Sequence, residues 1–221
     1  RPSNWRSSES LEDFLTKNKS IAISDIDTRN LTSHIRENGS MGCCIASLEE
    51  ITPEKAIERA KDFGGLKGMD LAKEVTTKDD YGWIEGTWPK YSETDKNLNI
   101  FAYDFGIKKN ILRLLTETVG KVDVVHAKTS YEDIMKKSPN GIFLSNGPGD
   151  PEPCEYAIEN IKLFLKAGIP IFGICLGHQL LSIAAGAKTY KMKFGHHGAN
   201  HPVQDIKSGE VYITSQNHGF A

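Results

Sequence analysis

Cys175 is the residue whose setting most clearly suggests chemistry. Glycines stand two residues before and after it, at Gly173 and Gly177, between an apolar run and a helical pattern. This spacing is typical of a nucleophile elbow, a tight strand-to-helix turn that projects the nucleophile above the sheet. At a helix N-terminus the thiolate is favoured, and the N–H of Leu176 would be placed to stabilise an oxyanion. From spacing alone, a buried cysteine at a strand–helix junction remains the alternative.

A second loop, from Asn146 to Pro151, contains the turn Gly147-Pro148-Gly149. A rigid turn of this kind can present backbone N–H groups to a developing negative charge. It could instead be a phosphate loop or simply a turn. Nucleotide binding is disfavoured, because a third glycine and a helix start are missing and the sequence contains no G-x-x-x-x-G-K-[ST] motif.

Three of the seven histidines, His196, His197 and His201, lie close together. A metal site is disfavoured there, since no cysteine or carboxylate has a matching spacing and the flanking glycines indicate a loop. His178 lies one helical turn after Cys175 and could face the thiol, but packing against the sheet is the favoured interpretation. We therefore predict no metal ligands, and the residues supply a nucleophile without a convincing general base.

The elements that must position these loops follow from a regular alternation after residue 99. Apolar runs predict strands at 100–103, 122–126, 141–145 and 169–174, and helical patterns lie at 108–118, 131–137, 155–166 and 176–185. Four strand–helix units in succession predict an α/β fold, a parallel sheet with helices on both faces. Sites in such sheets lie at the carboxyl ends of the strands, so the two loops should meet there.

The first hundred residues have weaker patterns. They predict helices near 10–18, at 28–37 and from residue 52, with a strand at 21–24; Asp27 or Thr28 could cap the second helix. The polar stretch between residues 82 and 99 has neither a period of 2 nor one of 3.6, so we expect the domain boundary there. Residues 1–97 would then form part of a smaller N-terminal α/β domain with its linker, and residues 98–221 the domain that carries the chemistry.

Composition excludes several classes of protein. The 221 residues are 38% hydrophobic and 25% charged, and 27 basic against 29 acidic residues give a net charge of -2. Such a balance provides no global positive field for nucleic acid or an anionic membrane, and no apolar run approaches the roughly 18 residues of a spanning helix. A soluble intracellular protein is favoured. Of the four cysteines, Cys43 and Cys44 are expected to be buried as small hydrophobic residues.

Several motifs carry a resemblance to a known family. The words Gly-Ile-Cys-Leu-Gly-His-Gln at 173–179 resemble the nucleophile motif of class I (triad) glutamine amidotransferases. The segments 145–151, 193–203 and 216–221, together with 25–32, narrow the resemblance to the small, glutaminase subunits of carbamoyl phosphate synthetases. It covers essentially the whole chain in register, and it separates the chain from amidotransferases that make anthranilate, aminobenzoate or GMP.

The resemblance implies a mechanism and a partner. Cys175 would attack the glutamine amide, form a glutamyl thioester and release ammonia. The residues implied around it are Leu176 and Gly149 for the oxyanion, Gly147 in the same pocket, and Gln179, Asn217, Gly219 and Phe220 to hold the glutamine. The ammonia would pass through a tunnel to a large subunit that uses ATP, Mg²⁺ and bicarbonate to make carbamoyl phosphate for pyrimidine or arginine biosynthesis. The chain itself is expected to need no cofactor.

The sequence also departs from the family pattern. Family members carry a catalytic His-x-Glu beyond the position of Ala221, and further N-terminal sequence, including a serine that contacts glutamine, before that of Arg1. We therefore expect a segment cut at both ends, weakly active or inactive by itself. The alternatives are a non-catalytic binding or regulatory module with the same pocket, and a cysteine hydrolase or chaperone of related topology. A cytoplasmic location is expected, or a plastid one if the source is a plant.

Overall fold

The computed structural model describes residues 3–5, 7–87 and 98–221, and the chain divides into two compact units, residues 1–65 and 66–221. The division lies ahead of the boundary predicted between residues 82 and 99, because the segment that follows residue 65 packs against the sheet of the second unit. Residues 88–97 of the predicted linker lie outside the described residues. The two units are therefore considered separately.

The first unit contains three helices, each begun by a side-chain cap. The helices are α1 (Leu11–Lys17), α2 (Thr28–Asn38) and α3 (Pro53–Asp62). Ser10, Asp27 and Thr52 each accept a hydrogen bond from the backbone N–H three residues later, which satisfies one of the donors left free at a helix start. Asp27 is thus the cap of α2, one of the two residues predicted for that position.

Two expectations for this unit are wrong. Residues 21–24 lie in irregular backbone instead of a strand, since the described part of the unit contains no second strand with which they could pair. Cys43 is exposed and Cys44 only half-buried, so neither is the buried hydrophobic residue expected. The described helices of this unit bury none of their residues, so the unit has no deep core to receive these thiols.

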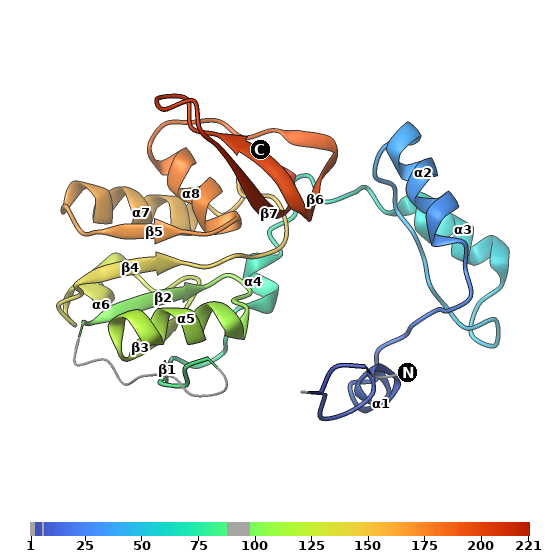
Figure 1. Cartoon of the computed structure of the whole chain (residues 1–221), viewed down its shortest axis with the longest axis horizontal. Helices are drawn as coiled ribbons and strands as arrows, with labels where there is room; N and C mark the ends of the chain where they lie inside the picture. Colours follow the sequence, from blue (N-terminus) through green and yellow to red (C-terminus); the bar gives the residue numbers. More distant parts are fainter. Residues whose placement is uncertain (1–2, 6, 88–97) are drawn as a thin grey trace. The chain divides into compact units, whose positions relative to one another are not determined.

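The second unit is built on a five-stranded sheet (Figure 1). Its strands are β1 (Tyr81–Trp83), β2 (Ile100–Asp104), β3 (Val122–His126), β4 (Gly141–Leu144) and β5 (Ile171–Gly173), in the order β1-β3-β2-β4-β5. The four strands β2 to β5 run parallel, and β1 pairs with β3 in the antiparallel direction. The parallel sheet predicted from the sequence is confirmed, and the short edge strand β1 was not predicted.

Four helices alternate with these strands. They are α5 (Lys109–Val119), α6 (Tyr131–Met135), α7 (Glu155–Lys166) and α8 (Leu176–Ala184). Every predicted strand and helix of the alternation is present, with ends that differ by at most two residues. Among the described residues, no helix is both long enough and apolar enough to cross a membrane.

Successive strand residues contribute to different cores on the two faces of the sheet. Phe101 and Tyr103 of β2 pack with apolar residues of α6, α7 and α8 on one face. Ala102, between them, packs with Leu112 of α5 on the other. This alternation places helices on both faces and explains the continuous apolar runs of the strands.

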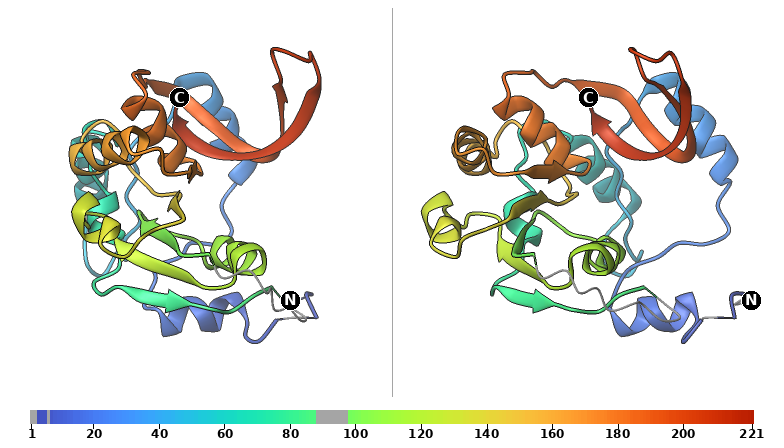
Figure 2. Two further views of the ribbon diagram at one scale, coloured as in Figure 1. Left: turned by 90° about the vertical axis from the view of Figure 1, so that its left-hand side faces the viewer. Right: turned by 60° about the vertical axis from the view of Figure 1, so that its left-hand side comes forward.

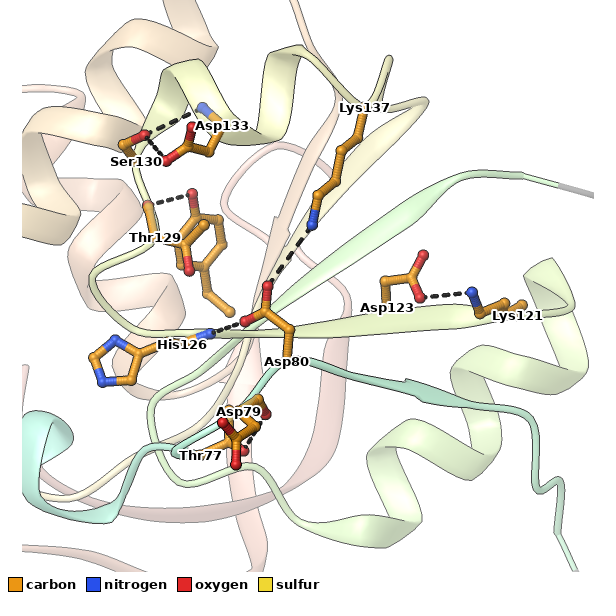
Figure 3. A network of polar contacts seen from close by, with 11 residues as sticks. Thr77, Asp79, Asp80, Lys121, Asp123, His126, Thr129, Ser130, Asp133 and Lys137 are labelled. Atoms are coloured by element: carbon orange, nitrogen blue, oxygen red, sulfur yellow. Dashed lines mark hydrogen bonds and ion pairs between the residues drawn. The ribbon is translucent and has the colours of Figure 1, made fainter.

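Residues 66–87 are fastened to the sheet by polar contacts (Figure 3). A carboxylate oxygen of Asp80 accepts the backbone N–H of His126 at 3.1 Å, and the other lies 3.7 Å from Nζ of Lys137. The N–H of Thr77, just after the short helix α4 (Ala72–Val75), donates to the buried carboxylate of Asp104 at 2.9 Å. These bonds explain why the segment belongs to the second unit.

The chain ends in a long antiparallel hairpin, β6 (Lys191–Gln204) and β7 (Val211–Phe220). The views in Figure 2 show it as a curved ribbon beside α8. The loop expected around residues 196–201 is therefore wrong, because these residues belong to β6. The register shifts twice, between residues 191 and 196 and between 198 and 201, so the sequence does not alternate regularly as a simple strand would.

Candidate active site

A pocket of about 560 Å³ lies where the strand ends, α8 and the hairpin of the second unit meet. Seven of the eight predicted site residues line it: Gly147, Gly149, Cys175, Gln179, Asn217, Gly219 and Phe220. The eighth, Leu176, is buried, and the role predicted for it concerns its backbone N–H. The structure thus brings together residues that lie up to 73 positions apart, counted from Gly147 to Phe220.

Cys175 occupies a strained elbow between β5 and α8. Its φ of 52° and ψ of -110° are unusual for a residue with a side chain. The flanking glycines allow this turn: a Cβ on Gly177 would lie 2.2 Å from the carbonyl oxygen of Leu144, and one on Gly173 would lie 2.6 Å from the carbonyl carbon of Gly177. The backbone of α8 therefore approaches β4 at Gly177, and β5 at Gly173, too closely for any larger residue at these two positions.

The thiol of Cys175 lies close to β7, the last strand of the hairpin. Its Sγ atom is half-buried and 3.6 Å from the backbone oxygen of Asn217 on β7. At the start of α8, the N–H of Gly177 donates to the backbone oxygen of Ser145 at 3.0 Å. This bond joins the helix to the end of β4. The nucleophile candidate therefore stands at the N-terminus of α8.

Two other segments of the chain pack against the Gly-Pro-Gly loop at residues 147–149. A Cβ on Gly147 would lie 2.2 Å from the backbone oxygen of Phe105, and one on Gly149 would lie 2.6 Å from that of Met69. Gly149 also has a φ of 94°, which glycine adopts without strain. Residues 66–71 thus fix the loop, a role that sequence reasoning missed because this short segment has no periodic pattern.

Asp150 joins the loop to this segment. Its carboxylate is buried and accepts the N–H of Gly68 at 2.8 Å and that of Glu152 at 3.0 Å. Its own N–H donates to the backbone oxygen of Met69 at 2.9 Å. One side chain therefore satisfies two backbone donors and holds residues 147–150 in place.

Asp150→Ala should lower the free energy of unfolding by about 2–3 kcal/mol, because two N–H groups lose a charged acceptor. Asp150→Asn keeps one acceptor oxygen but turns an amide N–H₂ toward the other donor, so about half of that loss is expected. Urea titration followed by circular dichroism measures both variants. An alanine variant within about 0.5 kcal/mol of the wild type would contradict the role given to this carboxylate.

The opposite wall of the pocket is held by hydrogen bonds between predicted site residues. Nε2 of Gln179 on α8 donates to the backbone oxygen of Phe220 at 2.6 Å. Nδ1 of His197 lies 2.7 Å from Oδ1 of Asn217, and its Nε2 lies 3.1 Å from the backbone oxygen of Phe194. The hairpin is thereby joined to α8 and supported from its own first strand.

The histidines differ from their predicted settings. His178 is exposed on α8, so the expected packing against the sheet is wrong, and it is not among the residues that line the pocket. The rings of His196 and His201 lie 5.0 Å apart, as do those of His196 and His218. Within residues 3–5, 7–87 and 98–221, no group of three His, Cys, Asp or Glu side chains is placed to hold a metal ion.

Cys154 provides a contrast with Cys175. It is fully buried, and its Sγ lies 3.5 Å from Oδ1 of Asp70. Burial, assisted by the charge of Asp70, raises the pKa of the Cys154 thiol to about 12. Cys154 therefore remains protonated near neutral pH and is a poor nucleophile.

Further pocket residues were not identified as site residues from the sequence. They are Leu66, Lys108, Ile111, Asn146, Pro148, Ile174, His197, Ser215, Gln216 and His218. Lys108 could have been found, since it follows β2 at the same edge of the sheet as the two loops. His197 and the residues from Ser215 to His218 belong to the hairpin, whose geometry the sequence pattern does not reveal.

The sequence of this chain is similar to those of carbamoyl phosphate synthase small chains. Residues 1–45 match the family "Carbamoyl-phosphate synthase small chain, CPSase domain". The chain is 55% identical to the carbamoyl phosphate synthase small chain of Pectobacterium atrosepticum and 54% identical to that of Vibrio parahaemolyticus, over 99% of its own length in both cases. It spans only 59% and 60% of these relatives. A solved glutamine amidotransferase from Thermotoga maritima is 21% identical, with a TM-score of 0.42 over 57% of this chain and 62% of that one.

The second unit carries the decisive match. Residues 101–221, more than half of the 221-residue chain, match the family "Glutamine amidotransferase class-I". They include the elbow, the Gly-Pro-Gly loop and the hairpin that closes the pocket. The chain therefore belongs to the class I glutamine amidotransferase family.

Proposed function

We propose that this protein hydrolyses the side-chain amide of glutamine through a Cys175 thioester and supplies the ammonia for carbamoyl phosphate synthesis. The observation that carries the proposal is the strained elbow at Cys175, which opens into a pocket lined by the Gly-Pro-Gly loop. The similarity to carbamoyl phosphate synthase small chains supports carbamoyl phosphate synthesis as the reaction that uses this ammonia.

The proposed chemistry follows from the groups around the thiol. The Cys175 thiolate attacks the amide carbon of the substrate, and the negative charge on the oxygen is stabilised by the N–H groups of Leu176 and Gly149. The C–N bond then breaks, and the nitrogen leaves as ammonia with the proton that the thiol gave up; water then hydrolyses the thioester to glutamate and restores the thiol. His197 contacts Asn217 and His218 contacts Phe220, so we assign neither histidine as the general base.

The proposed partner of this chain is a large subunit. In the proposed complex a large subunit holds ATP, Mg²⁺ and bicarbonate, receives ammonia through a tunnel and forms carbamoyl phosphate for pyrimidine or arginine biosynthesis. This chain supplies ammonia and binds no cofactor of its own, and the complex works in the cytoplasm. The name "small chain" of the relatives supports a larger partner.

A glutamine-analogue electrophile should label Cys175 of the full-length protein with one-to-one stoichiometry, and excess glutamine should protect it. Mass spectrometry of the tryptic peptides identifies the labelled residue. Label on another residue, or no protection by glutamine, would refute the proposed site. A protein that binds glutamine without forming ammonia would instead be a regulatory module with the same pocket.

Cys154 is the internal control for this experiment. Because the pKa of its thiol is raised to about 12, its thiolate fraction at pH 8 is about 10⁻⁴. Iodoacetamide at pH 8 should therefore modify Cys154 only after denaturation. Rapid native modification at pH 8 would contradict the burial of this thiol.

A further inference from the structure

Behind the pocket wall, His196 of β6 lies directly across the hairpin from His218 of β7. Nδ1 of His196 is 2.9 Å from Oε1 of Gln216 and 3.2 Å from Nε2 of His218. All three side chains are half-buried. Neither His196 nor Gln216 has a part in the function proposed above, and His196 does not line the pocket.

The direction of the hydrogen bonds can be worked out from the fixed acceptors. The hydroxyl of Thr214 donates to the backbone oxygen of His201 at 2.9 Å, because a carbonyl oxygen can only accept. Thr214 therefore accepts from Gln216 at 3.0 Å, and the atom it contacts must be the amide nitrogen Nε2. This orients Oε1 of Gln216, an acceptor, toward the two imidazole rings.

The same reasoning fixes the tautomer of His218. Its Nδ1 lies 2.7 Å from the backbone oxygen of Phe220 and must donate to it. A neutral His218 that is protonated at Nδ1 has a bare Nε2, which lies 2.9 Å from Oε1 of Gln216. Two acceptors this close require a shared donor, and Nδ1–H of His196 is placed to bridge both atoms.

We infer that His196 is a positioning residue that holds His218 in the Nδ1–H tautomer and thereby fixes the pocket wall. Without the His196 donor, the Nδ1–H tautomer of His218 leaves its bare Nε2 facing Oε1 of Gln216, so the preference for this tautomer falls. When the proton moves to Nε2, the bond to Gln216 forms, the bond to Phe220 is lost, and the bare Nδ1 and the backbone oxygen of Phe220 repel each other. That carbonyl also accepts from Gln179, so the disturbance reaches α8 and the pocket.

The expected functional effect is on glutamine binding, and this part of the inference rests on the proposed function. His196→Leu should raise the KM for glutamine about tenfold while kcat changes less than about twofold, since the residue touches none of the reacting atoms. His196→Asn places an amide N–H₂ near the position of Nδ1 and should restore KM to within about threefold of the wild type. His196→Gln is the matched control, because its amide reaches the position of Nε2 and should not rescue.

Nitrogen-15 NMR of the histidine side chains in the full-length protein tests the inference independently of activity. His218 should be the Nδ1–H tautomer in the wild type and in His196→Asn, and shift toward Nε2–H in His196→Leu and His196→Gln. An Nε2–H tautomer in the wild type, or an unchanged tautomer in His196→Leu, overturns the inference, as does equal impairment by Asn and Gln. A wild type without glutaminase activity would refute the proposed function, and the tautomer measurement would still decide the role of His196.

Discussion

Cys175→Ser should reduce glutamine hydrolysis by at least about 1,000-fold. A serine hydroxyl ionises far less readily than a thiol, so serine is a much weaker nucleophile toward the amide carbon. Serine is nearly isosteric with cysteine and can occupy the same strained backbone. The loss should therefore appear in kcat, measured as ammonia released from glutamine by the full-length protein.

Synthesis of carbamoyl phosphate from added ammonia provides the control for this variant. In the proposed complex with a large subunit, Cys175→Ser should lose glutamine-dependent synthesis of carbamoyl phosphate and keep synthesis from added ammonia. Loss of both activities would contradict the assignment of ammonia supply to this chain. Glutaminase activity that survives undiminished would remove Cys175 from the mechanism.

Gly177→Ala should destabilise the second unit by at least about 3 kcal/mol or prevent its folding. The added Cβ would meet the backbone oxygen of Leu144 at 2.2 Å and its carbonyl carbon at 2.5 Å. Neither atom can rotate away, so α8 would have to move off β4 and carry Cys175 with it. The midpoint of urea unfolding and the rate of Cys175 labelling measure these two effects.

Gly168→Ala separates this clash from the ordinary cost of replacing a glycine. Gly168 has a φ of 71°, and a Cβ there would meet no heavy atom of the described chain within 4 Å. Its replacement should therefore cost only about 1 kcal/mol, the penalty of a left-handed backbone. Equal costs at the two glycines would show that the close approach of α8 to β4 is unimportant.

The central sheet and its helices could be predicted because their signal is local and repeated. Helix α7 begins and ends at the predicted residues, 155 and 166, since its apolar stripe and the flanking turns are continuous in the sequence. The two loops could be placed at one edge of the sheet because parallel strands align their carboxyl ends. That rule predicts from the sequence that Gly147, Gly149 and Cys175 lie close together.

The rest of the site depends on contacts between distant segments. The hairpin was missed because register shifts interrupt the alternation of β6. The support of Gly149 by Met69 joins residues 80 positions apart and has no sequence pattern. His178 was expected to pack because of its spacing from Cys175, but helix spacing fixes only the direction of a side chain, and His178 is exposed to solvent.

The strained backbone at Cys175 lowers the stability of the fold at the position where the proposed chemistry needs a thiol. A residue with a side chain at φ 52° and ψ -110° costs about 1–3 kcal/mol, which glycine would avoid. A chain optimised for stability alone would therefore have glycine at the position of the proposed nucleophile. Destabilising substitutions elsewhere reduce the free energy of unfolding that remains to offset this strain. The elbow therefore limits how many such substitutions the second unit can tolerate.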